Sequence, residues 1–278
     1  MKTIYLCAIC NISSGNCSED CSFCTQSAHN GAEIDTYKQK DEQSILKEAH
    51  LAKQNRASGF CLVTAGKGLD DKKLDFICRI ATKIKKEIDI NLIACNGTAT
   101  LEQLKELKKA GIDSYNHNLE TSKRYYKNIC TTHSWEERFQ TCLNVKEAGI
   151  KLCSGGIFGL GESDEDRVSF VKSLQELQPA SIPLNFFHPN PKLPLPNKIL
   201  DIDEALKWIR YTREKLENSV IMIAGGREIT FKDRWTEIFD MGANSIVIGN
   251  YLTTKGDKPD KDIQTIEKLG YNIAQNCH

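Results

Sequence analysis

A short β-rich run followed by an amphipathic helical pattern recurs along the whole of this chain and sets narrow limits on its fold. The eight expected strands are residues 3–12, 59–64, 91–95, 112–118, 151–157, 181–187, 220–224 and 245–249. The helical patterns between them are residues 41–56, 69–86, 100–110, 134–148, 163–177, 202–217 and 231–241. Eight β/α repeats of about 30–35 residues predict a (β/α)8 TIM-type barrel, with a parallel sheet inside and helices outside.

Local signals at the helix ends agree with this pattern. Thr100 with Gln103, and Ser134 with Glu137, fit the capping box that starts a helix, and a glycine follows each of these two helices. The alternative architecture is a doubly wound open sheet. Its phosphate fingerprint lacks the third glycine at residues 159–164, and no Walker lysine loop is present. In a barrel, the reactive residues are expected at the carboxyl ends of the strands.

Composition excludes several classes of protein. The 278 residues include 37 basic and 37 acidic ones, and this zero formal net charge argues against binding nucleic acid by bulk electrostatics. A hydrophobic content of 40% supports a full core and excludes a disordered chain. No apolar run approaches the ~18 residues of a membrane helix, and the first residues carry no signal-peptide pattern. We therefore expect one cytoplasmic domain spanning residues 1–278, with a C-terminal tail at about 255–278.

The cysteines point to metal or redox chemistry. The chain has 12 of them and no export signal, so they are expected to stay reduced, and a disulfide scaffold is not expected. Some are expected to be small buried hydrophobic residues, namely Cys78, Cys130, Cys142 and Cys277.

Three cysteines form a triplet just after the first expected strand. Cys17, Cys21 and Cys24 have CxxxCxxC spacing on a loop expected at residues 13–30. Three nearby thiolates fit a soft metal, but a structural zinc ion normally takes four ligands and no second pair follows nearby. A 4Fe–4S cluster also usually takes four cysteines, so three leave one iron open to chelate the amine and carboxylate of an amino acid. The triplet favours such a cluster, with zinc or unrelated buried cysteines as alternatives.

The triplet resembles that of the radical S-adenosylmethionine (SAM) enzymes, which also have an aromatic residue before the last cysteine, here Phe23. Its sequence CSEDCSFCTQSAH is similar to the biotin synthase family. Other similar segments are GFCLV at 59–63, YNHNLET at 115–121, CSGGIFGLGE at 153–162, GANSI at 242–246 and LTT at 252–254. The resemblance implies a complete (β/α)8 barrel that binds SAM and a 4Fe–4S cluster. It implies reductive cleavage of SAM to a 5′-deoxyadenosyl radical and insertion of sulfur into dethiobiotin, which gives biotin.

The resemblance also implies a second, auxiliary iron–sulfur cluster inside the barrel, of the 2Fe–2S type, whose sulfide is the sulfur donor. Cys61, Cys95 and Cys153 match its thiolate ligands. Period-two alternation along three strands can send all three sulfurs into one lumen.

One position departs from the family pattern. The usual fourth ligand of the auxiliary cluster is an arginine, and Met222 stands in its place, with neither charge nor hydrogen-bond donor. Cys7 on the first strand is our candidate replacement; the alternative is that it is an ordinary core residue. Arg227 follows the strand and is expected to be structural, and Cys10 has the wrong parity relative to Cys7. The type of auxiliary cluster therefore stays open.

Three polar residues at the carboxyl end of the fourth expected strand, Asn116, Asn118 and Glu120, share one strand parity and are expected to line the substrate and SAM pocket; the alternative is capping or hydrogen-bonded loop structure. By resemblance, Asn118 and Asn185 contact the ureido ring of dethiobiotin, because an amide complements its N–H and carbonyl groups. Glu120 matches a contact to the SAM ribose. Thr253 and Thr254 match a hydroxyl pair near the substrate carboxylate; the alternative is a cap or turn.

Three further residues are expected near SAM. Gly159 and Gly161 let the backbone approach it, and Phe23 is expected to pack near its adenine, with ordinary surface packing as the alternative.

Two other functions stay open at this stage. One is a radical SAM barrel of the hydrogenase-maturation or methylornithine type, which shares the triplet but not the Cys61, Cys95 and Cys153 trio. The other is a non-catalytic electron carrier. The resemblance further implies an electron donor such as flavodoxin or ferredoxin and the iron–sulfur assembly machinery as partners. It leaves open whether the chain is a homodimer, and no nucleic-acid or membrane partner is expected.

Overall fold

The computed structural model describes residues 2–195 and 198–276 and consists of strands that alternate with helices. The strands are β1 (Thr3–Asn11), β2 (Gly59–Val63), β3 (Asn91–Cys95), β4 (Ser114–Asn116), β5 (Lys151–Cys153), β6 (Gly156–Phe158), β7 (Ser181–Phe186), β8 (Val220–Ile223), β9 (Ser245–Val247) and β10 (Asn272–Ile273). The helices are α1 (Glu42–Gln54), α2 (Asp71–Glu87), α3 (Leu101–Lys109), α4 (Lys123–Tyr126), α5 (Trp135–Glu147), α6 (Asp164–Leu177), α7 (Ile202–Lys215), α8 (Arg227–Phe231), α9 (Glu237–Asp240) and α10 (Pro259–Lys268).

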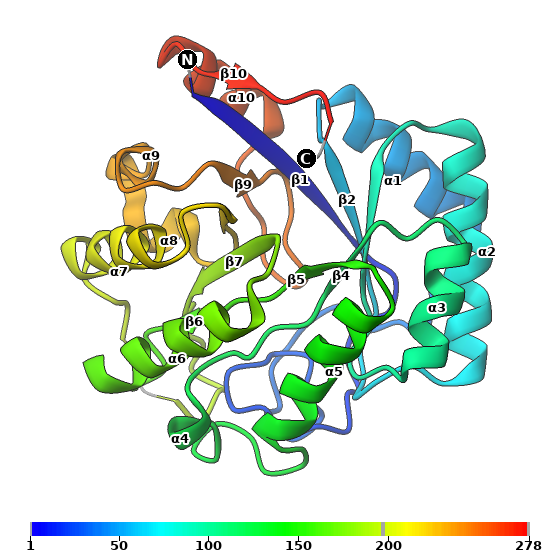
Figure 1. Cartoon of the computed structure of the whole chain (residues 1–278), viewed down its shortest axis with the longest axis horizontal. Helices are drawn as coiled ribbons and strands as arrows, with labels where there is room; N and C mark the ends of the chain where they lie inside the picture. The colour runs from blue at the N-terminus through cyan, green and yellow to red at the C-terminus, as the bar shows by residue number, and fades with distance from the viewer. Residues whose placement is uncertain (1, 196–197, 277–278) are drawn as a thin grey trace.

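The sheet closes into a parallel barrel. Its strand order is β1-β2-β3-β4-β5-β7-β8-β9, and β9 pairs with β1 in parallel, with Tyr5 opposite Ser245 and Cys7 opposite Val247. The expected TIM-type barrel is thereby confirmed, and the open sheet was the wrong alternative. Figure 1 shows the helices arranged around the strands.

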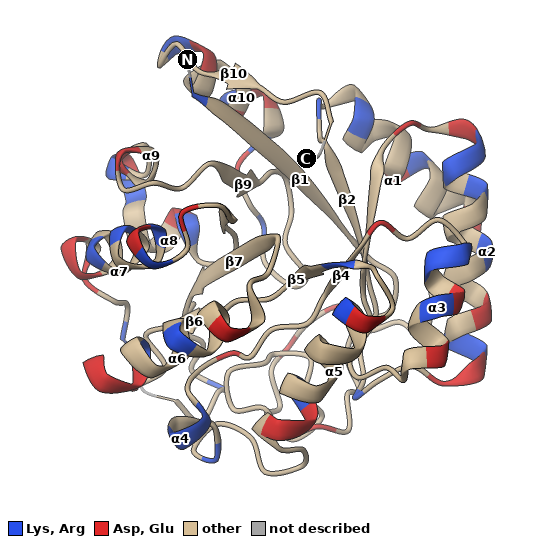
Figure 2. Cartoon of the chain, in the orientation of Figure 1, with Lys and Arg blue, Asp and Glu red and all other residues tan. Residues whose placement is uncertain are grey.

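Hydrophobic periodicity explains why the helices cover the barrel. On α2, the buried residues Leu74, Ile77, Ile80, Ala81 and Ile84 recur at helical spacing and form one stripe. All five residues of β2 are buried, as expected for a strand covered on both faces. The charged residues lie mostly on the outer helices, with both signs interspersed (Figure 2). Both capping boxes, at Thr100 and Ser134, are present.

Two expected elements are broken. The strand expected at 151–157 is two short strands, β5 and β6, because Gly155 brings the chain against β7: a Cβ there would lie 1.9 Å from the Pro183 carbonyl oxygen. The helix expected at 231–241 is instead the end of α8, a 3-10 turn (Lys232–Arg234) and α9. Lys232 has a φ of 51°, which interrupts the helix.

The C-terminal segment packs against the barrel. It contains α10, which is the helix of the eighth repeat, and β10, which pairs in parallel with β1 through Thr3 and Asn272. Cys277, expected to be buried, lies outside the described residues. Within residues 2–195 and 198–276, no helix has the length and apolar content needed to cross a bilayer.

A buried ion pair fixes α10 to the rest of the barrel. The Arg227 guanidinium donates to both Asp262 oxygens, at 2.9 and 2.7 Å, and the two side chains are 1% and 0% exposed. The guanidinium also lies 4.7 Å from the centre of the Trp235 ring. Arg227 is therefore structural, as expected, and is not directed at the thiols inside the barrel.

We predict that Arg227→Ala lowers the free energy of unfolding by about 3–5 kcal/mol, because it leaves a buried carboxylate without its counter-charge. Urea denaturation measures this loss. Arg234→Ala is the control, because Arg234 pairs with Asp203 and Glu237 while 39% exposed, and the loss of an exposed pair should cost far less stability. Equal losses for the two variants would contradict the structural role of Arg227.

Candidate active site

A cavity of about 540 Å³ opens at the carboxyl ends of the barrel strands. Seven cysteines are among its lining residues: Cys7, Cys17, Cys21, Cys24, Cys61, Cys95 and Cys153. The reactive residue types thus gather at the end of the barrel where parallel β/α folds place their chemistry.

The triplet lies on a loop that its own backbone holds in shape. Cys17 donates its N–H to the Gln26 carbonyl and its carbonyl accepts from Ala28, at 3.0 and 2.9 Å. The Asn30 side-chain amide donates to the carbonyls of Cys21 and Cys24, each at 2.9 Å. These bonds hold the loop over the cavity and leave the three thiols of the triplet among its lining residues. Burial raises the pKa of Cys24 to about 11.

The spacing of the triplet fits a multinuclear cluster better than one zinc ion. Tetrahedral zinc with bonds of about 2.3 Å places its sulfurs about 3.8 Å apart. Among the described residues, the only set of three or more potential ligands with all atoms within 4.8 Å is Cys21, Cys130 and His133, which is not the triplet. Three soft thiolates that are not crowded around a single point suit an iron–sulfur cluster.

Four further thiols point into the barrel lumen. Cys7, Cys61, Cys95 and Met222 belong to one apolar cluster in the lumen, and Cys153 lines the same cavity. A hydrogen bond to Cys95 raises the pKa of Cys61 well above its usual value, with further contributions from burial and from the charges of the neighbouring thiols. The four sulfurs therefore share one buried environment, which suits a second soft-metal group.

The strand parity of the cysteines agrees with the sequence analysis. Cys10 lies on the opposite face of β1 from Cys7, in the core between barrel and helices, where Lys40 Nζ is 3.9 Å from its sulfur. Burial raises the pKa of Cys10 strongly. Met222 lies on β8 opposite Pro183 of β7 and packs in the same apolar cluster of the lumen as Cys7 and Cys61.

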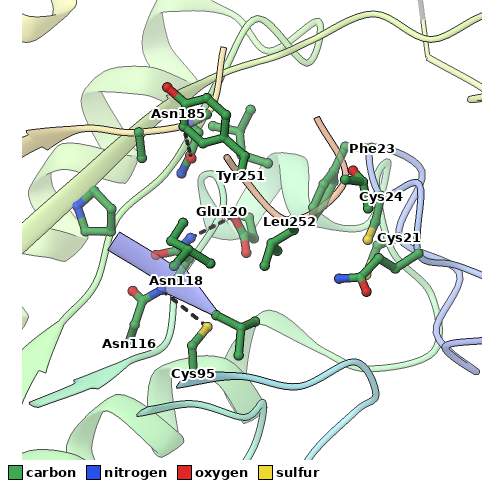
Figure 3. A pocket seen from close by; sticks show the side chains of 18 of the residues that line it. Cys21, Phe23, Cys24, Cys95, Asn116, Asn118, Glu120, Asn185, Tyr251 and Leu252 are labelled. Atoms are coloured by element: carbon green, nitrogen blue, oxygen red, sulfur yellow. Dashed lines mark hydrogen bonds between the residues drawn. The ribbon is translucent and has the colours of Figure 1, made fainter. Parts of the chain in front are cut away.

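Figure 3 shows the polar side of the cavity. The Asn118 side-chain oxygen accepts from the Gly155 N–H at 3.1 Å, and Asn116 donates to the Cys95 sulfur at 3.4 Å. β4 ends at Asn116, so of Asn116, Asn118 and Glu120 only Asn116 lies on the strand and is oriented by its alternation. Glu120 nevertheless lines the cavity, with a left-handed φ of 67°.

Arg138 is a residue of this site that the sequence analysis missed, and its side chain is 13% exposed. It donates to Glu120 Oε1 at 3.0 Å, to the Asn118 carbonyl at 2.5 Å and to His133 Nε2 at 3.1 Å. Burial raises the pKa of Glu120, and the charge on Arg138 opposes this rise. A sequence signal exists: Arg138 lies three residues after the buried Trp135 and so falls on the inward stripe of α5.

The other expected pocket residues divide into two groups. Asn185, Thr253, Thr254 and Phe23 line the cavity. The Asn185 amide bonds to the backbone of Gly156 and Gly225, at 3.2 and 2.9 Å, and the hydroxyls of Thr25 and Thr253 lie 2.8 Å apart. Gly159 and Gly161 are not among the lining residues, because the chain has turned outward toward α6 there.

Cys130 is buried as expected, but its surroundings are polar. Its sulfur lies 3.7 Å from Cys21 Sγ, 3.3 Å from His133 Nδ1 and 3.3 Å from Asp20 Oδ1. Treating it as a plain hydrophobic residue was therefore incomplete. Cys142 is fully buried, and Cys78 is half-buried.

Comparisons with known proteins agree with the fold and the thiols. The pattern of the Radical SAM superfamily matches residues 11–174, and that of the Biotin and Thiamin Synthesis associated domain matches residues 183–272. The biotin synthase of a Nitratiruptor species is 60% identical over 99% of both chains. That of Campylobacter lari is 59% identical, also over 99% of both chains.

Two solved structures share the fold at low sequence identity. The FeFe-hydrogenase maturase HydG from Carboxydothermus hydrogenoformans superposes with a TM-score of 0.82 at 17% identity, covering 98% of this chain and 68% of that one. Methylornithine synthase gives a TM-score of 0.83 at 18% identity, covering 98% of this chain and 84% of that one.

We predict that Arg138→Ala destabilises the chain by about 3–5 kcal/mol at neutral pH, because it leaves the buried Glu120 carboxylate unpaired. Removing Arg138 raises the pKa of Glu120 further, so the loss should grow as the pH rises through the pKa of Glu120 in the folded protein, which burial already holds above the ~4.3 usual for glutamate. Denaturant melts at pH 5 and pH 8 measure the difference. Adding Glu120→Gln should recover most of the stability; no recovery would contradict the pairing.

Proposed function

Because the chain belongs to the biotin synthase family of radical SAM enzymes, we propose that it inserts sulfur into dethiobiotin to form biotin. The observation that carries the proposal is that two groups of thiols line one cavity, one on the loop after β1 and one inside the barrel. The 60% identity to a biotin synthase favours this reaction over those of the two structural relatives, which share only the fold.

The reaction replaces C–H bonds that are not polarised, so acid–base groups alone offer no route to it. When bound, SAM with a 4Fe–4S cluster supplies the hydrogen-abstracting 5′-deoxyadenosyl radical, and an auxiliary cluster supplies the sulfide. The protein then has to hold SAM, dethiobiotin and the two clusters in one water-poor chamber, which a closed barrel with an apolar lumen provides.

At the mouth, Cys17, Cys21 and Cys24 are the proposed ligands of the 4Fe–4S cluster. The proposed ribose contact is Glu120, which Arg138 fixes in place at 3.0 Å. Phe23 lies on the same loop and offers an apolar surface to the adenine. The Thr25–Thr253 hydroxyl contact ties this loop to the segment after β9, so the cluster side and the substrate side of the cavity are held together.

Asn118 and Asn185 are the proposed partners of the dethiobiotin ureido group. Each amide has a carbonyl and two N–H donors, which complement the N–H and carbonyl groups of the ring. Their existing backbone bonds orient them before substrate arrives. Thr253 and Thr254 are proposed to bind the substrate carboxylate.

Cys7, Cys61, Cys95 and Cys153 are the proposed ligands of the auxiliary cluster. Met222 supplies no charge at the place where the family has an arginine. With Cys7 as the fourth ligand, an anionic thiolate takes the place of the arginine of the family. The bound cluster would then carry a more negative charge. The Asn116 amide, 3.4 Å from the Cys95 sulfur, is a donor that stabilises such charge.

The remaining proposals concern partners and location. We propose a flavodoxin or ferredoxin as the electron donor, the iron–sulfur assembly machinery as the source of both clusters, and the cytoplasm as the compartment. A homodimer is also proposed on the family pattern.

The reaction is tested with anaerobically reconstituted protein, SAM, a reductant and dethiobiotin. We predict that biotin and 5′-deoxyadenosine form, and that replacing Cys17, Cys21 or Cys24 by Ala abolishes the 5′-deoxyadenosine. Mass spectrometry quantifies both products. Release of 5′-deoxyadenosine that does not respond to dethiobiotin would point to another radical SAM reaction, and the absence of both products would point to an electron carrier.

The ligand role of Cys7 has a matched control on the same strand. We predict that Cys7→Ala lowers the iron and sulfide content and changes the auxiliary component of the Mössbauer spectrum. Cys10→Ala, on the opposite face of β1, should leave both unchanged. If Cys7→Ala left the auxiliary component intact, Cys7 would not be its fourth ligand.

A further inference from the structure

One thiol of the triplet meets two further side chains that can bind a metal. The sulfur-insertion reaction has no use for this grouping. Cys130 and His133 come from the segment between α4 and α5, and Cys21 comes from the loop after β1. Their sulfur and nitrogen atoms all lie within 4.8 Å of one another. Cys130 and His133 are buried, and Cys21 is half-buried.

The distances match the edges of a tetrahedral metal site. The two sulfurs are 3.7 Å apart, and Cys130 Sγ is 3.3 Å from His133 Nδ1. Around one zinc ion, bonds of about 2.3 Å to sulfur and about 2.0–2.1 Å to nitrogen give edges of about 3.8 and 3.5 Å. Two of the three edges therefore match those of a zinc site, and the third, between Cys21 and His133, is at most 4.8 Å.

A carboxylate and a phenol complete the surroundings. Glu19 Oε2 lies 2.6 Å from His133 Nδ1 and is buried with it, which provides an oxygen ligand on the same side of the ring. A metal on Nδ1 requires the proton on Nε2, and Tyr126 Oη, 2.7 Å from Nε2, can accept it. The Arg138 contact with Nε2, at 3.1 Å, then has to open, while Arg138 keeps its bond to Glu120. The three negative charges of two thiolates and one carboxylate balance the two positive charges of a divalent cation and the single positive charge of the adjacent Arg138 guanidinium.

We propose that the chain, when it lacks the 4Fe–4S cluster, binds one soft divalent cation such as Zn²⁺ or Fe²⁺ between Cys21, Cys130 and His133, with Glu19 as the fourth ligand. Binding releases the two thiol protons to solvent and forms two metal–sulfur bonds, with no change of oxidation state. Because Cys21 is also a proposed cluster ligand, the single ion and the cluster exclude one another. That exclusion rests on the proposed function, whereas the ion site does not.

Cobalt(II) is the probe, because its thiolate charge-transfer absorption reports the number of bound sulfurs. The cluster-free full-length chain is titrated anaerobically in a Cys7→Ser, Cys61→Ser, Cys95→Ser, Cys153→Ser background, which removes the four lumen thiols from the signal. Cys130→Ser and His133→Ala should each weaken binding by about tenfold or more, and Cys130→Ser should also lower the charge-transfer intensity. Cys17→Ser is the control from the triplet and should bind as the background does.

Alkylation of the unsubstituted chain tests the same site without any mutation. Adding Zn²⁺ should lower iodoacetamide labelling of Cys21 and Cys130 relative to the zinc-free chain and leave labelling of Cys17 and Cys24 unchanged, as read by peptide mass spectrometry. Equal protection of Cys17, Cys21 and Cys24, or cobalt binding that is lost in Cys17→Ser and kept in Cys130→Ser, would place the ion in the triplet and overturn the proposal.

The exclusion has its own measurement. Pre-bound Zn²⁺ should slow appearance of the 4Fe–4S absorption during reconstitution of the unsubstituted chain and should have little effect in Cys130→Ser. If zinc bound as proposed but reconstitution proceeded at the same rate, the exclusion and the assignment of Cys21 to the cluster would fail, while the ion site would stand.

Discussion

Closure of the barrel through the parallel pairing of β1 with β9 is the constraint on which the site depends. In a closed barrel, alternate residues of every strand face one lumen. Cys7 on β1 therefore faces the same interior as Cys61, Cys95 and Met222 on strands that lie far from it in sequence. An open sheet with the same strands would leave β1 at an edge and separate Cys7 from β8.

Buried polar groups organise the cavity around this geometry. Thiols and a carboxylate inside an apolar chamber are costly unless each has a partner. Arg138 pairs with Glu120 and also bonds to the Asn118 backbone and to His133, so one guanidinium links the segment after β4 to the segment before α5. The buried ion pair of Arg227 and Asp262 likewise fixes α10 to the rest of the barrel.

The sequence was informative wherever a periodic signal was local. Alternation along β1 correctly separated Cys7, which faces the lumen, from Cys10, which faces the helices. It failed where tertiary contacts decide the backbone, as at Gly155, where close approach to Pro183 divides the fifth strand. Cys130 could not be recognised either, because its contact with Cys21 joins residues 109 positions apart.

The central claim is that the barrel holds two separate iron–sulfur groups, one on the loop after β1 and one in the lumen. Anomalous diffraction at the iron absorption edge from crystals of the reconstituted chain tests it most directly. We predict two iron centres, one bounded by Cys17, Cys21 and Cys24 and the other by Cys7, Cys61, Cys95 and Cys153. A single iron centre, or zinc in place of iron between the three loop thiols, would contradict the account.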